Sequence, residues 1–243
     1  MRRNEDRDVT ASRAGRGDVA VLVPAAGRGE RLGPGLPKAL RELAGSPLLV
    51  HAVRRLAQAD CVGHVVVAVP AGAVDSVSAL LTPVLAGSGV GLDLVVGGAE
   101  RQQSVALALA AVPGGYPIIL VHDAARAFAP PELVDRVAAA VRAGSDAVIP
   151  VLPVVDTIKQ VDPDGAVTGT VDRSVLRAVQ TPQGFRRTVL AAAHAADTDG
   201  GATDDAGLVE RLGGRVTTVP GAESALKITR PFDLQVAALL VDP

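Results

Sequence analysis

Short apolar runs alternate along this chain with longer stretches in which apolar residues recur at helical spacing. The apolar runs are rich in Val, Ile and Leu and predict strands at 19–24, 64–70, 92–98, 117–123 and 146–151. The helical spacing predicts helices at 47–59, 73–85, 104–112 and 130–144. Because the strand segments show no polar face, we expect helices to cover both faces of the sheet. The pattern therefore predicts a three-layer α/β/α fold with a mostly parallel sheet.

One later stretch departs from this alternation. Residues 154–171 alternate apolar and polar positions around the turn "DPDG", which is typical of a β-hairpin. An exposed hairpin inserted in an α/β domain leaves an apolar face uncovered. Either the hairpin folds back on its own domain, or it is a protruding arm, about 153–179, that pairs with a second subunit. We expect the arm, and hence a homodimer.

The remaining pattern completes the domain. It predicts helices near 188–196 and 204–212, a strand at 215–220 and a last helix at 231–241. The first 18 residues carry both charge signs and almost nothing apolar, so we expect a disordered tail at 1–18 and a single domain at 19–243.

Composition limits which ligands and which cellular compartment we expect for this protein. The net charge is -2, and the aromatic residues are one Tyr and three Phe, which disfavours nucleic acid as the main ligand. There is no apolar run of about 18 residues and no secretory signal, so no membrane partner is expected. Cys61 is the only cysteine, so no intrachain disulfide can form. We expect a cytoplasmic protein.

A small-residue loop follows the first predicted strand, in "VPAAGRGERLGPGLPKAL" at 23–40. Its glycines at 27, 29 and 33 match neither the dinucleotide fingerprint nor the P-loop. Small residues at a strand end nevertheless expose backbone N–H groups, which form an anion-binding nest. Arg31 and Lys38 would add the charge needed to hold a polyphosphate. The alternative is an ordinary glycine-rich turn.

Two further strand ends carry polar residues. In "VHDAAR", 121–126, Asp123 is placed to serve a Mg²⁺-polyphosphate, although a surface Asp–Arg pair and a packed His122 are the simpler interpretations. In "GGAERQQSV", 97–105, Gly97 and Gly98 permit close backbone approach to a flat base, whereas Ser104 alone is better explained as a helix N-cap.

Seven segments in order resemble one known family. They are "PAAGRGERLGPGLPKAL", "GGAERQQSV", "HDAAR", "DTIK", "TPQGF", "ATDDAGLVE" and "LKITRPFDL". Together they resemble the 2-C-methyl-D-erythritol 4-phosphate cytidylyltransferases of the non-mevalonate isoprenoid pathway, from about residue 19 to the C-terminus. The first segment is shared with sugar-nucleotide pyrophosphorylases, so the ordered set carries the specificity. The resemblance implies a nucleotidyltransferase (Rossmann-like) fold and transfer of CMP from CTP to a small polyol phosphate.

The resemblance also implies site residues. On the CTP side it implies Ala25, Ala26, Gly27, Gly29, Gly98, Ser104, Asp123 and Ala124, with Asp123 beside Mg²⁺ or another divalent cation. On the acceptor side it implies Thr157, Arg173, Thr181, Thr203 and Lys227. The catalytic cations would be Arg31, Lys38, Arg173 and Lys227. This chain departs from the common pattern at Glu223, Ser224 and Ala225, and from some members at Ala99 and Gln103.

The residue types agree with that chemistry independently. A phosphate monoester is mostly dianionic at neutral pH, since its second pKa is about 6, so such a nucleophile needs no general base. Cations must instead hold two anions together in line. Other cytidylyltransferases (ribitol-phosphate or molybdopterin type), a sugar-nucleotide pyrophosphorylase and a non-catalytic nucleotide-binding protein remain alternatives. An assembly protein with an exchanging hairpin would bind no CTP.

Overall fold

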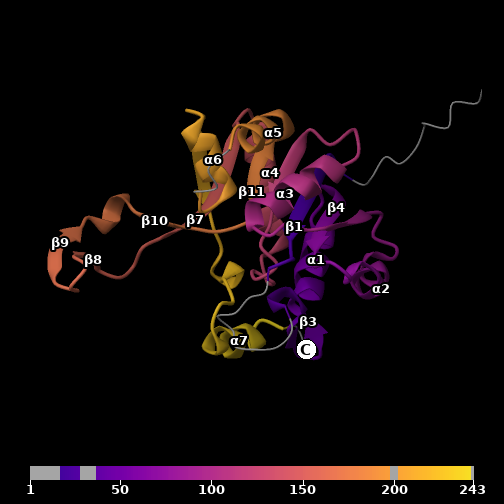
Figure 1. Cartoon of the computed structure of the whole chain (residues 1–243), viewed down its shortest axis with the longest axis horizontal. Coiled ribbons are helices and arrows are strands. Elements are labelled where there is room, and N and C mark those ends of the chain that lie inside the picture. Colours follow the sequence, from indigo (N-terminus) through magenta and orange to yellow (C-terminus); the bar gives the residue numbers. More distant parts are fainter. Residues whose placement is uncertain (1–16, 28–36, 198–201, 242–243) are drawn as a thin grey trace, which may run out of the picture.

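A mixed sheet forms the centre of the computed structural model, which describes residues 17–27, 37–197 and 202–241 (Figure 1). Its strands are β1 (Val19–Pro24), β4 (Val62–Val69), β5 (Gly91–Val96), β6 (Ile118–Val121), β7 (Ala147–Pro153), β10 (Arg177–Val179), β11 (Gln183–Arg186) and β12 (Val216–Pro220). They lie in the order β10-β7-β11-β6-β1-β4-β5, and β12 pairs with β7. Pairing is parallel except where β10 and β11 take part. The predicted mostly parallel sheet is therefore confirmed.

Helices cover both faces of this sheet. They are α1 (Leu48–Gln58), α2 (Val74–Leu85), α3 (Arg101–Ala111), α4 (Pro131–Arg142), α5 (Arg187–Ala196) and α6 (Asp205–Arg211), whereas a further helix, α7 (Pro231–Ala238), belongs to a separate apolar cluster. Alternate residues of β1 point to opposite sides, because Val21 belongs to one apolar cluster and Leu22 to another. The first cluster includes residues of α1, α2 and α4, and the second includes residues of α3, α5 and α6. The three predicted layers follow from this division.

Two strands of the sheet were not predicted. β10 and β11 come from the continuous segment 177–186, and β11 lies antiparallel between β6 and β7. The short strands β2 (Glu42–Leu43) and β3 (Ser46–Pro47) were also missed. Strands this short give too few positions for an apolar periodicity to show.

Helix α3 begins earlier than the pattern predicted. It starts at Arg101 and is preceded by Glu100, which forms a capping box with Gln103. Ser104 lies inside the first turn, where its hydroxyl donates to the Glu100 carbonyl oxygen at 3.1 Å. The simple N-cap interpretation of Ser104 is therefore wrong, because Glu100 caps this helix.

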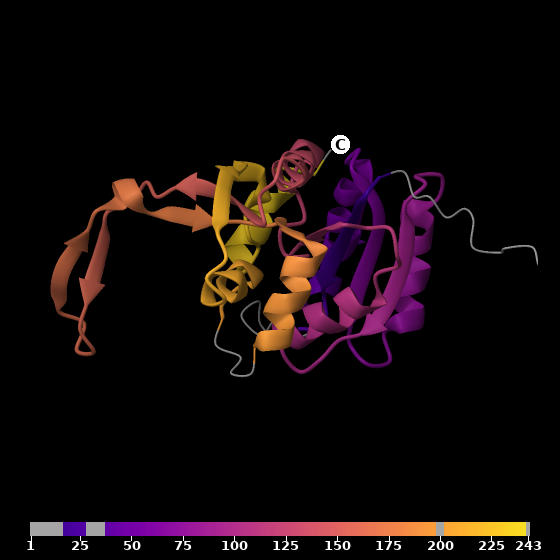
Figure 2. The ribbon, with the colours of Figure 1, turned by 90° about the horizontal axis from the view of Figure 1, so that it is seen from above.

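The predicted hairpin is present and extends from the body. β8 (Ile158–Val161) and β9 (Val167–Val171) pair only with each other among the described strands. Figures 1 and 2 both show them projecting away from the sheet beyond β10. Val155, Val161, Val167 and Val175 are all more than half exposed. The hairpin therefore does not fold back on its own sheet.

Three short 3₁₀ turns complete the described structure: η2 (Lys38–Leu40), η3 (Arg173–Val175) and η4 (Glu223–Ala225). No helix within 17–27, 37–197 and 202–241 has the length and apolar character needed to cross a membrane. The tail predicted at 1–18 lies, except for Gly17 and Asp18, outside the described residues.

Candidate active site

Three loops meet at the carboxyl edge of the sheet, after β1, β5 and β6. They enclose a cavity of about 240 Å³. Its described lining residues are Pro24, Ala25, Ala26, Gly27, Lys38, Ala39, Gly98, Ala99, Glu100, Arg101, Ser104, Asp123, Ala124, Ala125 and Lys227. The ligand sites of open α/β sheets lie at this edge. Most residues predicted for the CTP side thus share one cavity.

The loop after β1 supplies the small-residue wall. The Ala25 amide donates to the Ala68 carbonyl oxygen at 2.7 Å, which ties the start of the loop to β4. Ala26 and Gly27 line the cavity, and Lys38 faces it from the first position of η2. Gly29 and Arg31, which were predicted to act here, lie outside the described residues.

The loop after β5 approaches this wall very closely. A Cβ added to Gly97 would lie 2.5 Å from the Ala26 Cβ, so only glycine fits between the two loops. The Gly98 amide donates to the Ser104 hydroxyl oxygen at 3.2 Å. Close packing within the protein therefore requires Gly97, and Ser104 holds the Gly98 backbone at the cavity wall.

Asp123 lies at the centre of the cationic part of the cavity. Arg101 Nε donates to one carboxylate oxygen at 3.2 Å, and Lys227 Nζ lies 2.7 Å from the other. Burial alone would raise the pKa of Asp123, but Arg101 and Lys227 more than offset it and hold that pKa well below its ordinary value. Asp123 is therefore ionised throughout the neutral range.

Lys227 reaches the cavity through its neighbours in the chain. The amide of Ile228 donates to the Ala125 carbonyl oxygen at 2.8 Å, which fixes this segment against the loop after β6. Lys227 was predicted on the acceptor side and Asp123 on the CTP side. The structure places the two side chains in contact, so Lys227 shares one cavity with the residues predicted for CTP.

Arg101 lines the cavity and forms two ion pairs there, although the sequence predicted no role for it. Its Nη1 also donates to the Asp205 carboxylate at 2.7 Å, and Asp205 is fully buried at the start of α6. Burial would lower the pKa of Arg101, but Asp205 and Asp123 reverse that effect and raise it. The available signal was a cation directly after the "GGAE" strand end, at the edge where Asp123 was already expected.

Thr181 and His122 form hydrogen bonds that hold the loop after β6. The Asp123 amide donates to the Thr181 hydroxyl oxygen at 3.0 Å, and that oxygen lies 3.2 Å from His122 Nδ1. Both side chains are buried. His122 is thus a packed, hydrogen-bonded histidine. Thr181, predicted to contact the acceptor, is here engaged inside the protein.

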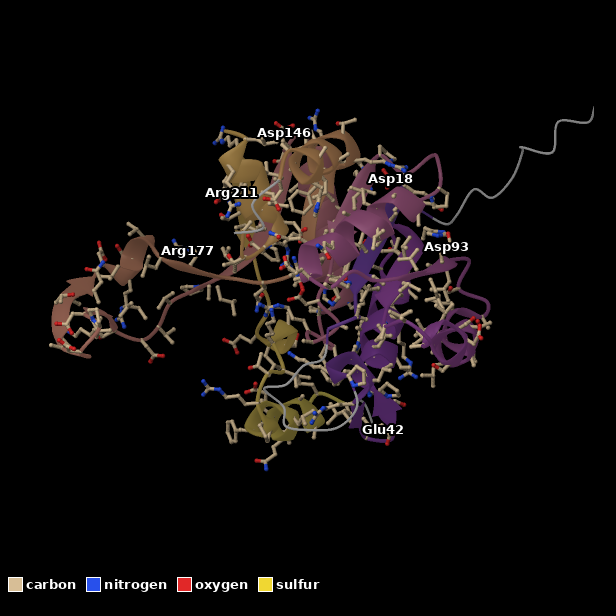
Figure 3. All side chains as sticks on the ribbon, in the orientation of Figure 1. Asp18, Glu42, Asp93, Asp146, Arg177 and Arg211 are labelled. Carbon is tan, nitrogen blue, oxygen red and sulfur yellow. The ribbon has the colours of Figure 1, made fainter. Side chains whose placement is uncertain are left out.

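The other predicted acceptor residues are not among the residues that line the cavity of their own chain. Thr157 and Arg173 are exposed on the arm, where an Arg173 Nη1 donates to the Val155 carbonyl oxygen. Thr203 is exposed just before α6, whose N-cap Asp204 accepts from the Gly207 amide at 2.9 Å. Figure 3 shows the side chains of the arm, which projects from the body beyond the labelled Arg177 of β10.

Two of the positions that depart from the common family pattern, Gln103 and Ala225, have local structural roles. Gln103 Oε1 accepts from the Ala99 amide at 3.0 Å and completes the cap of α3. Ala225 is fully buried, and its carbonyl oxygen accepts from Arg126. Both positions therefore shape the backbone around the cavity.

Asp123 is a carboxylate of the cavity that could hold a divalent cation arriving with phosphate. No group of three or more His, Cys, Asp or Glu side chains that could hold a metal occurs within the described ranges. Mg²⁺ commonly takes one or two carboxylates together with substrate phosphate oxygens. Asp123 matches the single-carboxylate case, because it is ionised and lines the cavity.

Comparison with known proteins agrees with this architecture. A family model described as 2-C-methyl-D-erythritol 4-phosphate cytidylyltransferase matches residues 19–242. Proteins of that name from Frankia casuarinae and Saccharopolyspora erythraea are 56% and 58% identical, over 92% and 90% of this chain and 81% and 97% of theirs. A crystal structure of the Thermus thermophilus enzyme of that name is 41% identical with a TM-score of 0.72, covering 90% of this chain and 96% of that one. This chain therefore belongs to the 2-C-methyl-D-erythritol 4-phosphate cytidylyltransferase family.

Proposed function

We propose that this protein transfers CMP from CTP to 2-C-methyl-D-erythritol 4-phosphate, with release of pyrophosphate. The observation that carries the proposal is the cavity at the carboxyl edge of the sheet. There, backbone from two small-residue loops faces Lys38, Lys227 and Asp123. Such a cavity offers a polyphosphate cationic side chains and room between small residues, and we assign no general base to it.

The chemistry needs none. An oxygen of the acceptor phosphate attacks the α-phosphorus of CTP, the new P–O bond forms, and the bond to the β-phosphate oxygen breaks. The electron pair leaves with pyrophosphate. Because the nucleophile is already anionic at neutral pH, with a second pKa of about 6, the barrier lies in bringing two anions into line.

The cationic side chains of this chain would offset the repulsion between the two anions. Lys38 borders the small-residue loop and is assigned to the phosphate charge that grows as pyrophosphate departs. Arg31 is assigned the same role because the segment that contains it resembles the corresponding segment of the family. Lys227 is assigned to the acceptor phosphate, which requires it to exchange its contact with Asp123 for one with substrate.

Mg²⁺ is the proposed cofactor, and Asp123 is the residue that would hold it. The bound ion would neutralise triphosphate charge that one lysine cannot balance. Both Asp123 oxygens already contact cationic side chains in this structure. We therefore expect the carboxylate to accept the metal only together with CTP.

The active form is proposed to be a cytoplasmic homodimer joined through the arm. Thr157 and Arg173 are exposed on a hairpin that leaves its own body, and the apolar residues beside them are uncovered. A second copy of the arm would cover those residues. Arg173 would then reach the acceptor phosphate in the partner's cavity.

Pyrophosphate release tests the proposal. Purified protein is incubated with CTP, Mg²⁺ and 2-C-methyl-D-erythritol 4-phosphate, and parallel reactions contain ribitol 5-phosphate or glucose 1-phosphate, other nucleotides, or EDTA. We expect release only with CTP, the methylerythritol phosphate and a divalent cation. Faster release with ribitol 5-phosphate or with a sugar phosphate would instead indicate one of the related enzymes. CTP binding without turnover of any acceptor would indicate a regulator.

A further inference from the structure

We propose that Arg101 is a positioning residue that couples the nucleotide side of the cavity to the acceptor side. The inference rests on the proposed function and assigns a role to a residue outside the predicted catalytic set. It starts from one geometric fact: a single guanidinium bridges two carboxylates that are 82 positions apart in sequence, Asp123 and Asp205.

The bridge uses two different nitrogens of Arg101. Nε donates to Asp123 at 3.2 Å and Nη1 donates to Asp205 at 2.7 Å. Arg101 occupies the first position of α3, so its backbone is held by the helix and its capping box. A lysine at this place could carry the charge, but its single ammonium group lacks the planar fork that reaches both carboxylates.

Asp205 depends on this contact because it has no access to water. Its side chain is 0% exposed, and its other oxygen lies 3.0 Å from His194 Nε2 on α5. Burial would raise the pKa of Asp205, yet hydrogen bonding to His194 and the charge of Arg101 lower it. A buried carboxylate that loses one of two such partners is strongly destabilised.

The segment before Asp205 carries the predicted acceptor residue Thr203. It is held to α3 by the neighbour of Arg101, since Gln102 Nε2 donates to the Ala202 carbonyl oxygen at 2.8 Å. It is also held to β11, because Gln183 Nε2 donates to Asp204 at 2.6 Å. The backbone on both sides of Thr203 is therefore attached to the start of α3. Gln102 makes this attachment through a hydrogen bond to Ala202, and Arg101 makes it through an ion pair with Asp205.

The consequence is coupling between the two substrates. A ligand that binds the Asp123 carboxylate weakens the contact between Asp123 and Arg101. Arg101 then interacts more strongly with Asp205, and the attachment of the segment that carries Thr203 changes. Such coupling is reciprocal for binding free energies. Loss of Arg101 should weaken acceptor binding more than CTP binding, because before the acceptor binds Asp123 keeps Lys227, whereas among the described residues Asp205 keeps only His194.

Four variants test the role: Arg101→Met, Arg101→Lys, Asp205→Asn and the double variant Arg101→Met/Asp205→Asn. We measure KM for each substrate, kcat and calorimetric CTP affinity, on protein whose folded fraction is known from urea unfolding. Arg101→Met should raise the acceptor KM by about tenfold and change CTP affinity by less than about threefold. Arg101→Lys should fall between wild type and Arg101→Met.

The double variant separates positioning from general damage. Without the Asp205 charge, removal of Arg101 leaves no unpaired buried carboxylate, so the double variant should have an acceptor KM no higher than Arg101→Met alone. The matched control is Arg187→Met, since Arg187 donates to the Val112 and Pro113 carbonyl oxygens at the far end of α3. It should lower stability and leave both KM values unchanged.

Two results would overturn the inference. One is an acceptor KM for Arg101→Met within about twofold of wild type, and the other is simple additivity of the two substitutions. Failure of the proposed function is a different result: wild-type protein would release no pyrophosphate with CTP and the acceptor.

Discussion

Lys38 occupies a position where its effect on turnover and its effect on binding should separate. It lines the cavity beside backbone that can hold the phosphates, so the loss of one ammonium group leaves other contacts for CTP. Lys38→Ala should lower kcat by about 10²–10³, as removal of one donor to developing transition-state charge does in other enzymes. CTP affinity, measured by calorimetry, should fall far less.

Arg54→Ala is the control for Lys38→Ala, because Arg54 is exposed on α1 and does not line the cavity. It should retain wild-type kinetics. Near-normal kcat in Lys38→Ala would remove that lysine from the catalytic role.

His122 makes the stability of the ligand-free protein depend on pH. Burial lowers the pKa of this imidazole from 6.5 to about 4. As pH falls below the ordinary value, the unfolded chain takes up the proton and the folded protein does not, so the free energy of unfolding decreases. The loss from His122 should be about 2 kcal/mol between about pH 7 and pH 5.

Urea unfolding of wild type and His122→Gln at the two pH values measures this loss. The variant keeps a polar group near Thr181 but cannot titrate, so its stability should change less over the same interval. An equal change in both proteins would contradict the assignment to His122.

At the scale of elements, one buried arginine joins three segments. Arg126 follows β6, and its guanidinium donates to the Ala225 carbonyl oxygen at 2.7 Å and to the Val179 carbonyl oxygen at 3.0 Å. Val179 is the last residue of β10 at the root of the arm, and Ala225 is two residues before Lys227. Arg126→Met should cost about 3 kcal/mol of unfolding free energy, because two carbonyl groups lose a charged donor.

The matched comparison is Arg136→Met. Arg136 donates to the Pro220 carbonyl oxygen at 2.8 Å, in the same part of the chain, but this contact is exposed. Its loss should cost less than about 1 kcal/mol in the same urea titration. Equal losses of unfolding free energy in the two variants would show that the buried contacts of Arg126 contribute no more stability than the exposed contact of Arg136.

Elements with a long apolar pattern were predictable, and those fixed by tertiary contacts were not. β1 was predicted at its observed bounds because six consecutive residues, 19–24, carry the signal and its first five are buried. β10 and β11 together span 177–186 and are held by pairing with β7 and β6, which no local pattern reveals. The start of α3 was misplaced because its cap is a Glu–Gln pair rather than a serine.

The same distinction applies to the site. Ala25, Gly98 and Asp123 could be predicted because each follows a strand end, and strand ends of a parallel sheet meet at one edge. The contact between Lys227 and Asp123 and the bridge made by Arg101 depend on how distant segments pack. Spacing along the chain carries no information about such contacts.

At the scale of the whole molecule, the arm separates residues that the proposed reaction needs together. Lys38 lines the cavity of the body, whereas Arg173 lies on the arm that projects from it (Figure 2). If the arm crosses a two-fold interface, each site takes Lys38 from one chain and Arg173 from the other. Lys38→Ala and Arg173→Ala should each be nearly inactive alone.

Refolding the two variants together tests this sharing. Each mixed dimer would contain one site with both defects and one site with neither. Random pairing makes half the dimers mixed, and half of their sites are intact, so an equal mixture should regain roughly a quarter of wild-type activity. The matched control mixes Lys38→Ala with Lys227→Ala, whose two defects lie in the same cavity. In that mixture every site has one defect, so no activity should return. Equal behaviour of the two mixtures would contradict a site shared between subunits, even in a protein that proves dimeric.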